Sequence, residues 1–384
     1  MADNAASKRS SRTFMSDAIE AAKKHFLEGV AHFEAKRLEE ADRAFSAAHK
    51  LVPDRPSVLT NLGAVRLQLG RPEEAVPLLA QATALEPDNL QAWAHLGIAQ
   101  AETGDLDQAV VSFDKALGID GKSAVLWTHR GTALREMGHL PEAVKSFEQA
   151  REHGADPHVI GYFLASMQGG EAPPSPPRAY VENLFDRYAD DFSDHLVEVL
   201  GYRAPEELID GLAPLGARWF DDVLDLGCGT GLCGPLLKGM ASRIDGVDLS
   251  ARMLAQARGL GVYSELVHAD IVEWLKTARQ PYDLVLAVDV FIYVGALESV
   301  FADVGRLLKP GGMFAFTVEE NTRTAGVNPQ ELQLMPSLRY AHPEAYVRRV
   351  AADAGLQVRA MHRAPLRQDQ AQPVPGAYYY LSKP

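Results

Sequence analysis

The sequence predicts two architectures in tandem: an all-helical repeat array, then an α/β domain whose parallel sheet is wrapped by helices. Small residues recur at a strict spacing of 34 positions in the first part of the chain. From Asp222 onward, short apolar runs alternate with helical stretches, as is typical of a parallel sheet. The length of 384 residues exceeds what one hydrophobic core usually supports, which fits a repeat array joined to a separate domain.

The repeat is defined by columns of residues that share the 34-residue period. A small residue is needed where two antiparallel helices approach closely, and a large one where they leave a gap. Pro53 and Pro87 fall where the second helix of a repeat should end. The small columns are Gly29, Gly63, Gly97 and Gly131; Ala41, Ala75, Ala109 and Ala143; and Ala48, Ala82, Ala116 and Ala150, while the large column is Phe45, Leu79, Phe113 and Phe147.

This pattern resembles the tetratricopeptide repeat (TPR), whose W-x2-L-G signature stands most fully at Trp93, Leu96 and Gly97. The resemblance covers about residues 22 to 157 in four copies, and Arg130 replaces the expected Leu in the fourth. A repeat array needs a cap at each end, and we expect residues 158–168 to supply the last one.

The TPR resemblance implies a concave groove that binds a protein or peptide partner. The expected lining lacks the Lys and Asn set by which chaperone-binding relatives hold a C-terminal carboxylate. The alternative is that the array only packs on the second domain or on another subunit. The residues expected to line the groove are Phe26, Val30, Phe33, Thr60, Ala64, Leu67, Ala94, Ile98, Thr128 and Thr132.

Domain boundaries follow from these patterns. We predict a flexible N-terminus over residues 1–21, the repeat domain with its capping helix over 22–168, and the second domain over 179–384. Residues 169–178, GGEAPPSPPR, hold two glycines and four prolines, and this density predicts a short semi-rigid linker.

Composition narrows the classes of partner and the compartment. The net charge of -13 opposes binding to nucleic acid or to anionic membranes, which leaves only a local basic patch as a route to either. No apolar stretch reaches the roughly 20 residues of a membrane span, and the basic N-terminus lacks the apolar segment of a secretory signal. The two cysteines, Cys228 and Cys233, are five positions apart in one turn, where a disulfide would close a very small loop. We therefore expect a reducing cytoplasm.

The second domain opens with VLDLGCGTG, from Val223 to Gly231, which predicts a strand, a glycine-rich turn and a helix. Glycines suit a turn whose backbone a bound cofactor approaches closely. Gly229, Gly231 and Gly234 also fit G-x-G-x-x-G, the dinucleotide fingerprint. An acid at the next strand end, Asp248, would accept hydrogen bonds from ribose hydroxyls in any bound nucleotide. It therefore does not show whether the cofactor is a dinucleotide.

Three other features favour a different nucleotide. Asp225 precedes the turn, where a carboxylate suits a cofactor with a free ammonium group but brings no advantage for a pyrophosphate. A third acidic strand end, Asp270 in LVHADI, suits an adenine amine. The segment from Leu307 to Glu319, LLKPGGMFAFTVE, predicts a helix, a turn and a strand.

These segments together resemble class I methyltransferases that use S-adenosylmethionine, over roughly residues 180 to 384. The resemblance implies a Rossmann-like seven-stranded domain that converts S-adenosylmethionine to S-adenosylhomocysteine. It assigns the ribose to Asp248 and the adenine side to Asp270, with apolar flanks for the ring. The implied cofactor-binding residues are Asp225, Gly227, Cys228, Gly229, Gly231, Asp248, Leu249, Met253, Asp270 and Ile271.

Each of these residues also has a simpler interpretation. Asp248 or Asp270 alone could cap a helix, and Asp225 alone could accept bonds from backbone donors. Cys228 is better interpreted as a small residue tolerated in the turn than as a reactive thiol. Tyr188 and Phe192, in an aromatic-rich segment that covers the cofactor in related methyltransferases, are candidate lid residues or core positions at helical spacing.

The acceptor side is expected after the strand DLVLAVDVFIYV, where Asp289, Phe291 and Tyr293 could line a pocket. No Asn/Asp-Pro-Pro-Tyr sequence is present, so methylation of a planar amide or base amine by that device is not supported. Arg339 could hold a substrate carboxylate. His342 could act as a base, or could instead be the N-cap-side partner of the helix that Pro343 starts.

The combined arrangement looks like bacterial predicted methyltransferases with N-terminal tetratricopeptide repeats. It implies methyl transfer to an unidentified small-molecule or protein acceptor, with the repeats binding a partner. In-line attack on a sulfonium requires positioning and exclusion of water rather than a covalent nucleophile. No metal is implied, because the twelve histidines show neither H-E-x-x-H nor a Cys/His ligand spacing. The alternatives are a non-catalytic interaction scaffold and an NAD-dependent oxidoreductase.

Overall fold

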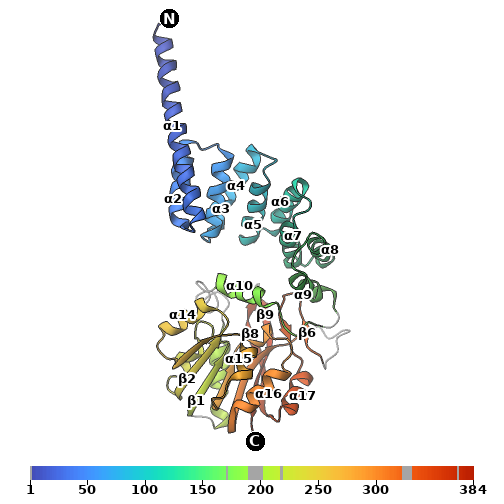
Figure 1. Cartoon of the computed structure of the whole chain (residues 1–384). Helices are drawn as coiled ribbons and strands as arrows, with labels where there is room; N and C mark the ends of the chain where they lie inside the picture. Colours follow the sequence, from blue (N-terminus) through green and yellow to red (C-terminus); the bar gives the residue numbers. More distant parts are fainter. Residues whose placement is uncertain (1, 170–171, 189–201, 217–218, 322–330, 370–371) are drawn as a thin grey trace. The chain divides into compact units, whose positions relative to one another are not determined.

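The computed structural model describes residues 2–169, 172–188, 202–216, 219–321, 331–369 and 372–384 (Figure 1). The chain forms two compact units, residues 1–160 and 161–384, and each is described by itself. Within the described residues, no helix combines the length and the apolar character that crossing a bilayer requires.

The first unit consists of helices that pair in sequence order, α1 with α2, α3 with α4, α5 with α6, and α7 with α8. Short loops join the helices, so each pair is an antiparallel hairpin. This arrangement confirms the predicted TPR-like repeat region. The helices are α1 (Ala2–Glu34), α2 (Leu38–Leu51), α3 (Pro56–Gln68), α4 (Pro72–Leu85), α5 (Leu90–Glu102), α6 (Leu106–Ile119), α7 (Ala124–Glu136) and α8 (Leu140–Glu152).

The predicted columns of small and large residues meet inside each hairpin. A Cβ atom on Gly97 would lie 2.6 Å from the ring of Phe113, and one on Gly63 would lie 2.6 Å from Leu79. The same pairing joins Gly29 to Phe45 and Gly131 to Phe147. Every alanine of the two alanine columns is fully buried. The 34-residue period is therefore the length of one hairpin with its loops, and the small and large residues that meet inside it are 16 positions apart.

Both ends of this unit differ from the prediction. Helix α1 begins at Ala2, so residues 2–21, predicted to be flexible, continue the first repeat helix. At the other end, α9 (Pro157–Gln168) is present where a capping helix was expected, but the boundary between the two units lies within it, after Ile160. Tyr162, in the part of α9 after this boundary, is 2% exposed and donates a hydrogen bond to the carbonyl of Leu338, at 2.7 Å.

The proline-rich segment that follows α9 also makes defined contacts. The carbonyl of Pro173 accepts a hydrogen bond from the Tyr340 hydroxyl, at 2.8 Å, and the carbonyl of Pro174 accepts one from the Ala296 backbone, also at 2.8 Å. The segment predicted as a linker is therefore anchored on the second unit. We infer that the second unit begins inside α9 and not at residue 179.

The second unit is built on a sheet of order β3-β2-β1-β4-β5-β9-β8. Strands β1 to β5 run parallel, and β9 enters antiparallel between β5 and β8. These seven strands, in a sheet of nine that also includes the short β6 and β7, form the predicted Rossmann-like domain. The strands are β1 (Phe220–Leu226), β2 (Ala241–Asp248), β3 (Glu265–His268), β4 (Tyr282–Ala287), β5 (Leu308–Glu319), β8 (Gln357–Asp369) and β9 (Gln372–Ser382), with a short pair β6 (Gln333–Leu334) and β7 (Tyr340–Ala341) at the end of β5.

Helices cover both faces of the sheet, as Figure 1 shows for α15, α16 and α17 on one side. Successive residues of a strand point to opposite faces, so Val285 of β4 belongs to one apolar core and Leu284 and Leu286 belong to the other. The covering elements are α10 (Arg178–Tyr188), α12 (Ala204–Asp210), η2 (Ala213–Leu215), α13 (Cys233–Leu237), α14 (Ala251–Gly259), α15 (Ile271–Thr277), η3 (Phe291–Tyr293), α16 (Glu298–Leu307) and α17 (Glu344–Asp353).

Candidate active site

The glycine-rich turn after β1 has a backbone that glycine alone adopts readily. Gly227, Gly229 and Gly231 have φ angles of 66°, 53° and 92°, in the left-handed region. The N–H groups of Gly227 and Cys228 donate to the carbonyl of Val247 at 2.7 and 3.1 Å, which ties the turn to β2. A Cβ atom on Gly227 would also lie 2.5 Å from Val290. Glycine is therefore required in the predicted turn by its backbone conformation and, at Gly227, also by close packing.

Asp248 closes this turn at the end of β2. One carboxylate oxygen accepts a hydrogen bond from the Gly229 N–H at 2.9 Å, and the other accepts one from the Ser250 N–H at 2.8 Å. Ser250 caps α14 by accepting a hydrogen bond from Met253, so Asp248 is not itself the cap. Burial raises the pKa of Asp248, although the N–H bonds from Ser250 and Gly229 act against that rise. The carboxylate thus joins the turn, β2 and α14 at one point.

Asp225, the last but one residue of β1, is 1% exposed. Its carboxylate accepts a hydrogen bond from the Tyr263 hydroxyl at 2.7 Å. Burial raises the pKa of Asp225 to about 7, the bond from Tyr263 acts in the opposite direction, and the neighbouring Asp248 adds to the rise. A buried carboxylate that is half ionised near neutral pH is suited to meet a cationic group.

Asp270 caps a helix, which is the alternative role that the sequence left open. It is the N-cap of α15, and one of its oxygens accepts hydrogen bonds from Val272 and Glu273 at 2.8 and 3.0 Å. The neighbouring Ile271 is 8% exposed. Both bonds use the same oxygen, so the cap and a contact to an adenine amine are compatible.

The remaining predicted cofactor residues differ in accessibility. Met253 is 1% exposed and lies in the packed interior, whereas Leu249 is half-buried. Cys228 is buried, and burial raises the pKa of its thiol well above the usual value. Its interpretation as a small neutral residue in the turn is thereby favoured. Tyr188 ends α10, but its side chain lies outside the described residues, as does the whole of Phe192.

The structure brings Asp289 into a buried ion-pair cluster beyond the end of β4. Asp289 has a φ of 59°, and its N–H donates to the Thr317 hydroxyl at 2.8 Å. Both of its carboxylate oxygens accept from one nitrogen of Arg367, at 2.7 and 2.8 Å, and the other terminal nitrogen of Arg367 donates to Glu319 at 2.8 Å. The Arg367 side chain is 4% exposed.

Arg339 and Tyr293, which the sequence suggested for the acceptor side, adjoin this cluster. Burial and the charge of Arg367 oppose ionisation of Arg339, but a hydrogen bond with the Tyr293 hydroxyl and the charge of Asp289 raise its pKa. The Tyr293 ring also meets Phe185 edge to face, with centroids 5.0 Å apart. Asp289, Tyr293 and Arg339 therefore come together, and Arg367 and Glu319 join them.

Arg367, Glu319 and Tyr263 were not among the functional residues predicted from the sequence. Glu319 did carry a signal, because it ends a strand of the predicted parallel sheet, where functional side chains gather. Arg367 and Tyr263 lie outside every motif.

Two residues expected on the acceptor side lie elsewhere. His342 is 0% exposed, and its Nε2 is 2.8 Å from the carbonyl of Gly295. Burial lowers the pKa of His342 to about 4. The side chain has no exposed surface from which it could contact an acceptor, so the structure favours the alternative that His342 is an interior residue before the helix that follows Pro343. Phe291 is also 0% exposed and packs with Phe301, Phe314 and Phe316 rather than lining a pocket.

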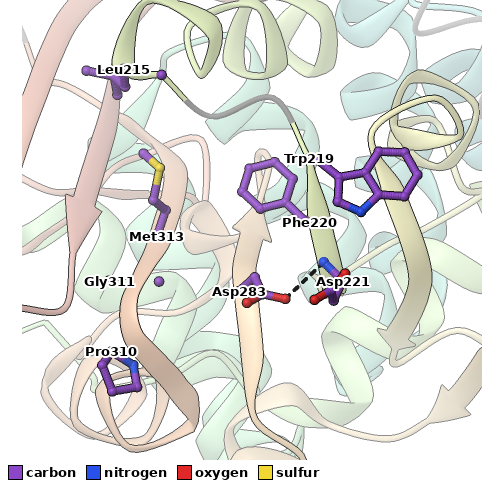
Figure 2. Close-up of a pocket in the computed structure, with 10 residues that line it drawn as sticks. Leu215, Trp219, Phe220, Asp221, Asp283, Pro310, Gly311 and Met313 are labelled. Carbon is purple, nitrogen blue, oxygen red and sulfur yellow. Dashed lines mark hydrogen bonds between the residues drawn. The ribbon is translucent and has the colours of Figure 1, made fainter.

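A cavity of about 350 Å³ lies at the amino ends of the parallel strands, on the side of the sheet away from Asp225 and Asp248. Figure 2 shows its lining, which includes Trp219, Phe220 and Met313, and the 3.0 Å hydrogen bond from the Asp221 N–H to Asp283. These residues lie near the amino ends of β1, β4 and β5. Open α/β sheets bind ligands at the carboxyl ends of their strands, where Asp225, Asp248 and Asp289 gather. We therefore do not assign the chemistry to this cavity.

A parallel sheet with a left-handed glycine turn after β1 and a buried acid at the end of β2 defines a nucleotide-binding domain of the Rossmann-like class. Residues 223–312 match the family described as a methyltransferase domain, and residues 60–124 match the tetratricopeptide repeat. The chain belongs to the class I S-adenosylmethionine-dependent methyltransferases and carries TPR repeats before its methyltransferase domain.

Two relatives and one solved structure indicate the range of similarity. The malonyl-[acyl-carrier protein] O-methyltransferase of Enterobacter lignolyticus is 32% identical over 177 residues, which are 46% of this chain and 66% of that protein. The ubiquinone biosynthesis O-methyltransferase of Thiobacillus denitrificans is 31% identical over 167 residues, 38% of this chain and 71% of that one. The magnesium protoporphyrin IX methyltransferase of Synechocystis PCC 6803, solved with S-adenosylhomocysteine, has a TM-score of 0.42 and 16% identity, covering 54% of this chain and 99% of that chain.

Proposed function

We propose that the chain transfers a methyl group from S-adenosylmethionine to a small-molecule or protein acceptor, and that its repeat array binds a partner or mediates assembly. The observation that carries the proposal is the union of the Gly227–Gly231 turn with two buried carboxylates, Asp225 and Asp248, at neighbouring strand ends.

The residues at this edge fit the parts of that cofactor. Asp225 would receive the ammonium group, and the left-handed turn would let the backbone approach the amino acid portion without a Cβ in the way. Asp248 would accept hydrogen bonds from the ribose hydroxyls. Leu249 and Ile271 would flank the adenine ring, with Asp270 beside its amine. When bound, the cofactor supplies an electrophilic methyl group on a sulfonium.

For the acceptor, we propose an oxygen nucleophile that is already anionic, such as a carboxylate. Arg339 and Tyr293 lie together beside Asp289, where a guanidinium could hold an anionic group. His342, the histidine suggested as a base, is fully buried. An acceptor oxygen that is already anionic needs no base. Two of the relatives reported above carry the name O-methyltransferase, which agrees with an oxygen acceptor.

Calorimetry on the full-length protein tests the first part of the proposal. We expect S-adenosylmethionine and S-adenosylhomocysteine to bind at one site per chain, and NAD not to bind. Binding of NAD in their place would contradict the assignment and favour the oxidoreductase alternative. Failure to bind any of the three would favour a non-catalytic scaffold.

A screen with methyl-labelled cofactor tests the acceptor and the role of the repeats. We would offer carboxylate-bearing small molecules and protein fractions to the full chain and to a fragment that begins at Pro157, so that α9 stays intact. Labelling of a macromolecule by the full chain alone supports recruitment by the repeats. Equal labelling by both would leave the repeats a role in assembly.

A further inference from the structure

Tyr263 lies between α14 and β3, outside every sequence motif of the domain. Its hydroxyl donates to the Asp225 carboxylate at 2.7 Å. Its ring faces three glycines: a Cβ atom would lie 3.0 Å from the ring at Gly231, 2.8 Å at Gly234 and 3.2 Å at Gly246. One side chain therefore contacts the acid at the end of β1, the turn that follows it, α13 and β2.

These contacts explain two glycines that backbone conformation does not. Gly231 has a φ of 92° and needs glycine for that reason alone. Gly234 and Gly246 are not among the described glycines with positive φ. At both positions, any larger residue would collide with Tyr263 or with a side chain next to it. Gly234, the third glycine of the dinucleotide-like pattern, is therefore a packing residue for Val262 and Tyr263, at 2.5 and 2.8 Å from its would-be Cβ.

We propose that Tyr263 is a positioning residue of the cofactor site, whose hydroxyl orients the Asp225 carboxylate toward the cofactor ammonium and whose ring sets how closely the turn and β2 approach. The proposal rests on the proposed function, because it takes the ammonium of S-adenosylmethionine as the partner of Asp225. Tyr263 is not a catalytic residue, since it acts through Asp225 and not on the reacting atoms.

The groups around Asp225 determine how the hydroxyl acts. Tyr263, the Asp248 carboxylate and the buried thiols of Cys228 and Cys233 face it. Burial and the charge of Asp225 raise the pKa of Tyr263, so its hydroxyl keeps its proton and remains a donor. Burial raises the pKa of Asp225 to about 7, and the donated bond opposes that rise. Without the hydroxyl, Asp225 would stay protonated to a higher pH and would bind a cation less well.

The test is the pH dependence of S-adenosylhomocysteine binding to the full-length protein and to Tyr263→Phe, measured by calorimetry from pH 5.5 to 8. In the wild type we expect affinity to fall about tenfold per pH unit below the pKa of Asp225. In Tyr263→Phe the acid limb should move to higher pH by about one unit, so affinity at pH 7 falls by up to about tenfold. The affinities should converge toward pH 8, before the ligand's own amino group loses its proton.

A matched control is Tyr282→Phe, which removes another buried hydroxyl that donates to an aspartate, Asp245, at 3.1 Å in the same sheet. We expect this variant to lose stability but to keep the wild-type pH profile. A second variant, Asp225→Asn, should bind weakly and without an acid limb, which confirms the identity of the titrating group even if Tyr263→Phe does not fold.

The outcomes separate this proposal from the proposed function. A Tyr263→Phe protein with the wild-type profile, or with the same loss of affinity at every pH, would overturn the positioning role. An acid limb that persists in Asp225→Asn would overturn it as well. If the wild type binds S-adenosylhomocysteine at no pH, the proposed function itself fails.

Discussion

The Gly229 N–H donates to the Asp248 carboxylate at 2.9 Å, which makes the turn after β1 and the acid at the end of β2 a single structural unit. The other oxygen of Asp248 holds Ser250, the cap of α14. The carboxylate therefore fixes the turn that we propose binds the cofactor. Substitutions in the turn and at Asp248 should have coupled effects on binding.

Asp248→Ala should abolish cofactor binding in calorimetry. The change removes two bonds from the backbone and the acceptor for the ribose, so we expect a loss of about 3 kcal/mol or more, roughly two orders of magnitude in affinity. Asp245→Ala, three residues earlier on the same strand, is the control and should leave affinity unchanged. Unchanged affinity in Asp248→Ala would count against the assigned site.

Gly227→Ala should destabilise the methyltransferase unit and weaken cofactor binding. The new Cβ would lie 2.5 Å from Val290 at a backbone with φ of 66°. We expect a loss of roughly 2–4 kcal/mol, because backbone strain and steric overlap add.

Gly311→Ala separates the two contributions to the Gly227→Ala loss. Gly311 also has a positive φ, 77°, but a Cβ there meets nothing within 4 Å. Its loss in thermal unfolding should be near 1 kcal/mol, from strain alone. Equal losses at the two positions would show that the contact with Val290 does not matter.

How much of this structure was predictable depends on the sequence distance between interacting residues. Gly97 and Phe113 are 16 positions apart and the pair recurs in each repeat, so the pattern is visible without coordinates. Asp225 and Gly227 to Gly231 are contiguous, and the motif they form is equally local. The parallel direction of β1 to β5 was predictable because strands and helices alternate along the sequence.

The parts that escaped prediction depend on single long-range contacts. Arg367 meets Asp289 across 78 positions, and Tyr162 meets Leu338 across 176. No periodicity marks an isolated arginine in a strand or a single tyrosine in the middle of a helix. His342 was ambiguous for the opposite reason, because a polar residue before a helix suits either catalysis or the interior, and only its burial decides.

Arg367→Met should destabilise the protein by about 3–5 kcal/mol, because it leaves Asp289 and Glu319 buried without their cation. Urea unfolding measures the loss. Arg363→Met is the control on the same strand, since Arg363 is 54% exposed and pairs with Glu320 and Glu344 at the surface. Its loss should stay within about 1 kcal/mol. Similar losses in both variants would contradict the structural role assigned to the buried cluster.

Tyr162→Phe should impair methyl transfer without changing cofactor affinity. The Tyr162 hydroxyl holds the carbonyl of Leu338, which has a φ of 63° and directly precedes Arg339. Loss of this bond should cost about 1 kcal/mol of stability and loosen Arg339, which raises the KM for an anionic acceptor.

Tyr380→Phe is the matched control for Tyr162→Phe, because its hydroxyl donates to the carbonyl of Leu208 at 3.0 Å, in a contact that includes no residue of the acceptor side. It should show a similar stability loss with an unchanged KM. An equal rise in KM in the two variants would argue against a specific role for α9.

His342→Gln should change how stability depends on pH while leaving the pH profile of activity unchanged. His342 has a pKa of about 4 in the folded chain, against about 6.5 when unfolded, so the folded state binds fewer protons between these values. Its contribution to stability is therefore complete above pH 6.5 and is lost as the pH falls toward 4. Between pH 7 and pH 5, urea unfolding should show the wild type losing about 2 kcal/mol more than His342→Gln, whose amide can still donate to Gly295. If His342 were a base in methyl transfer, His342→Gln would instead remove the acid limb of the rate profile.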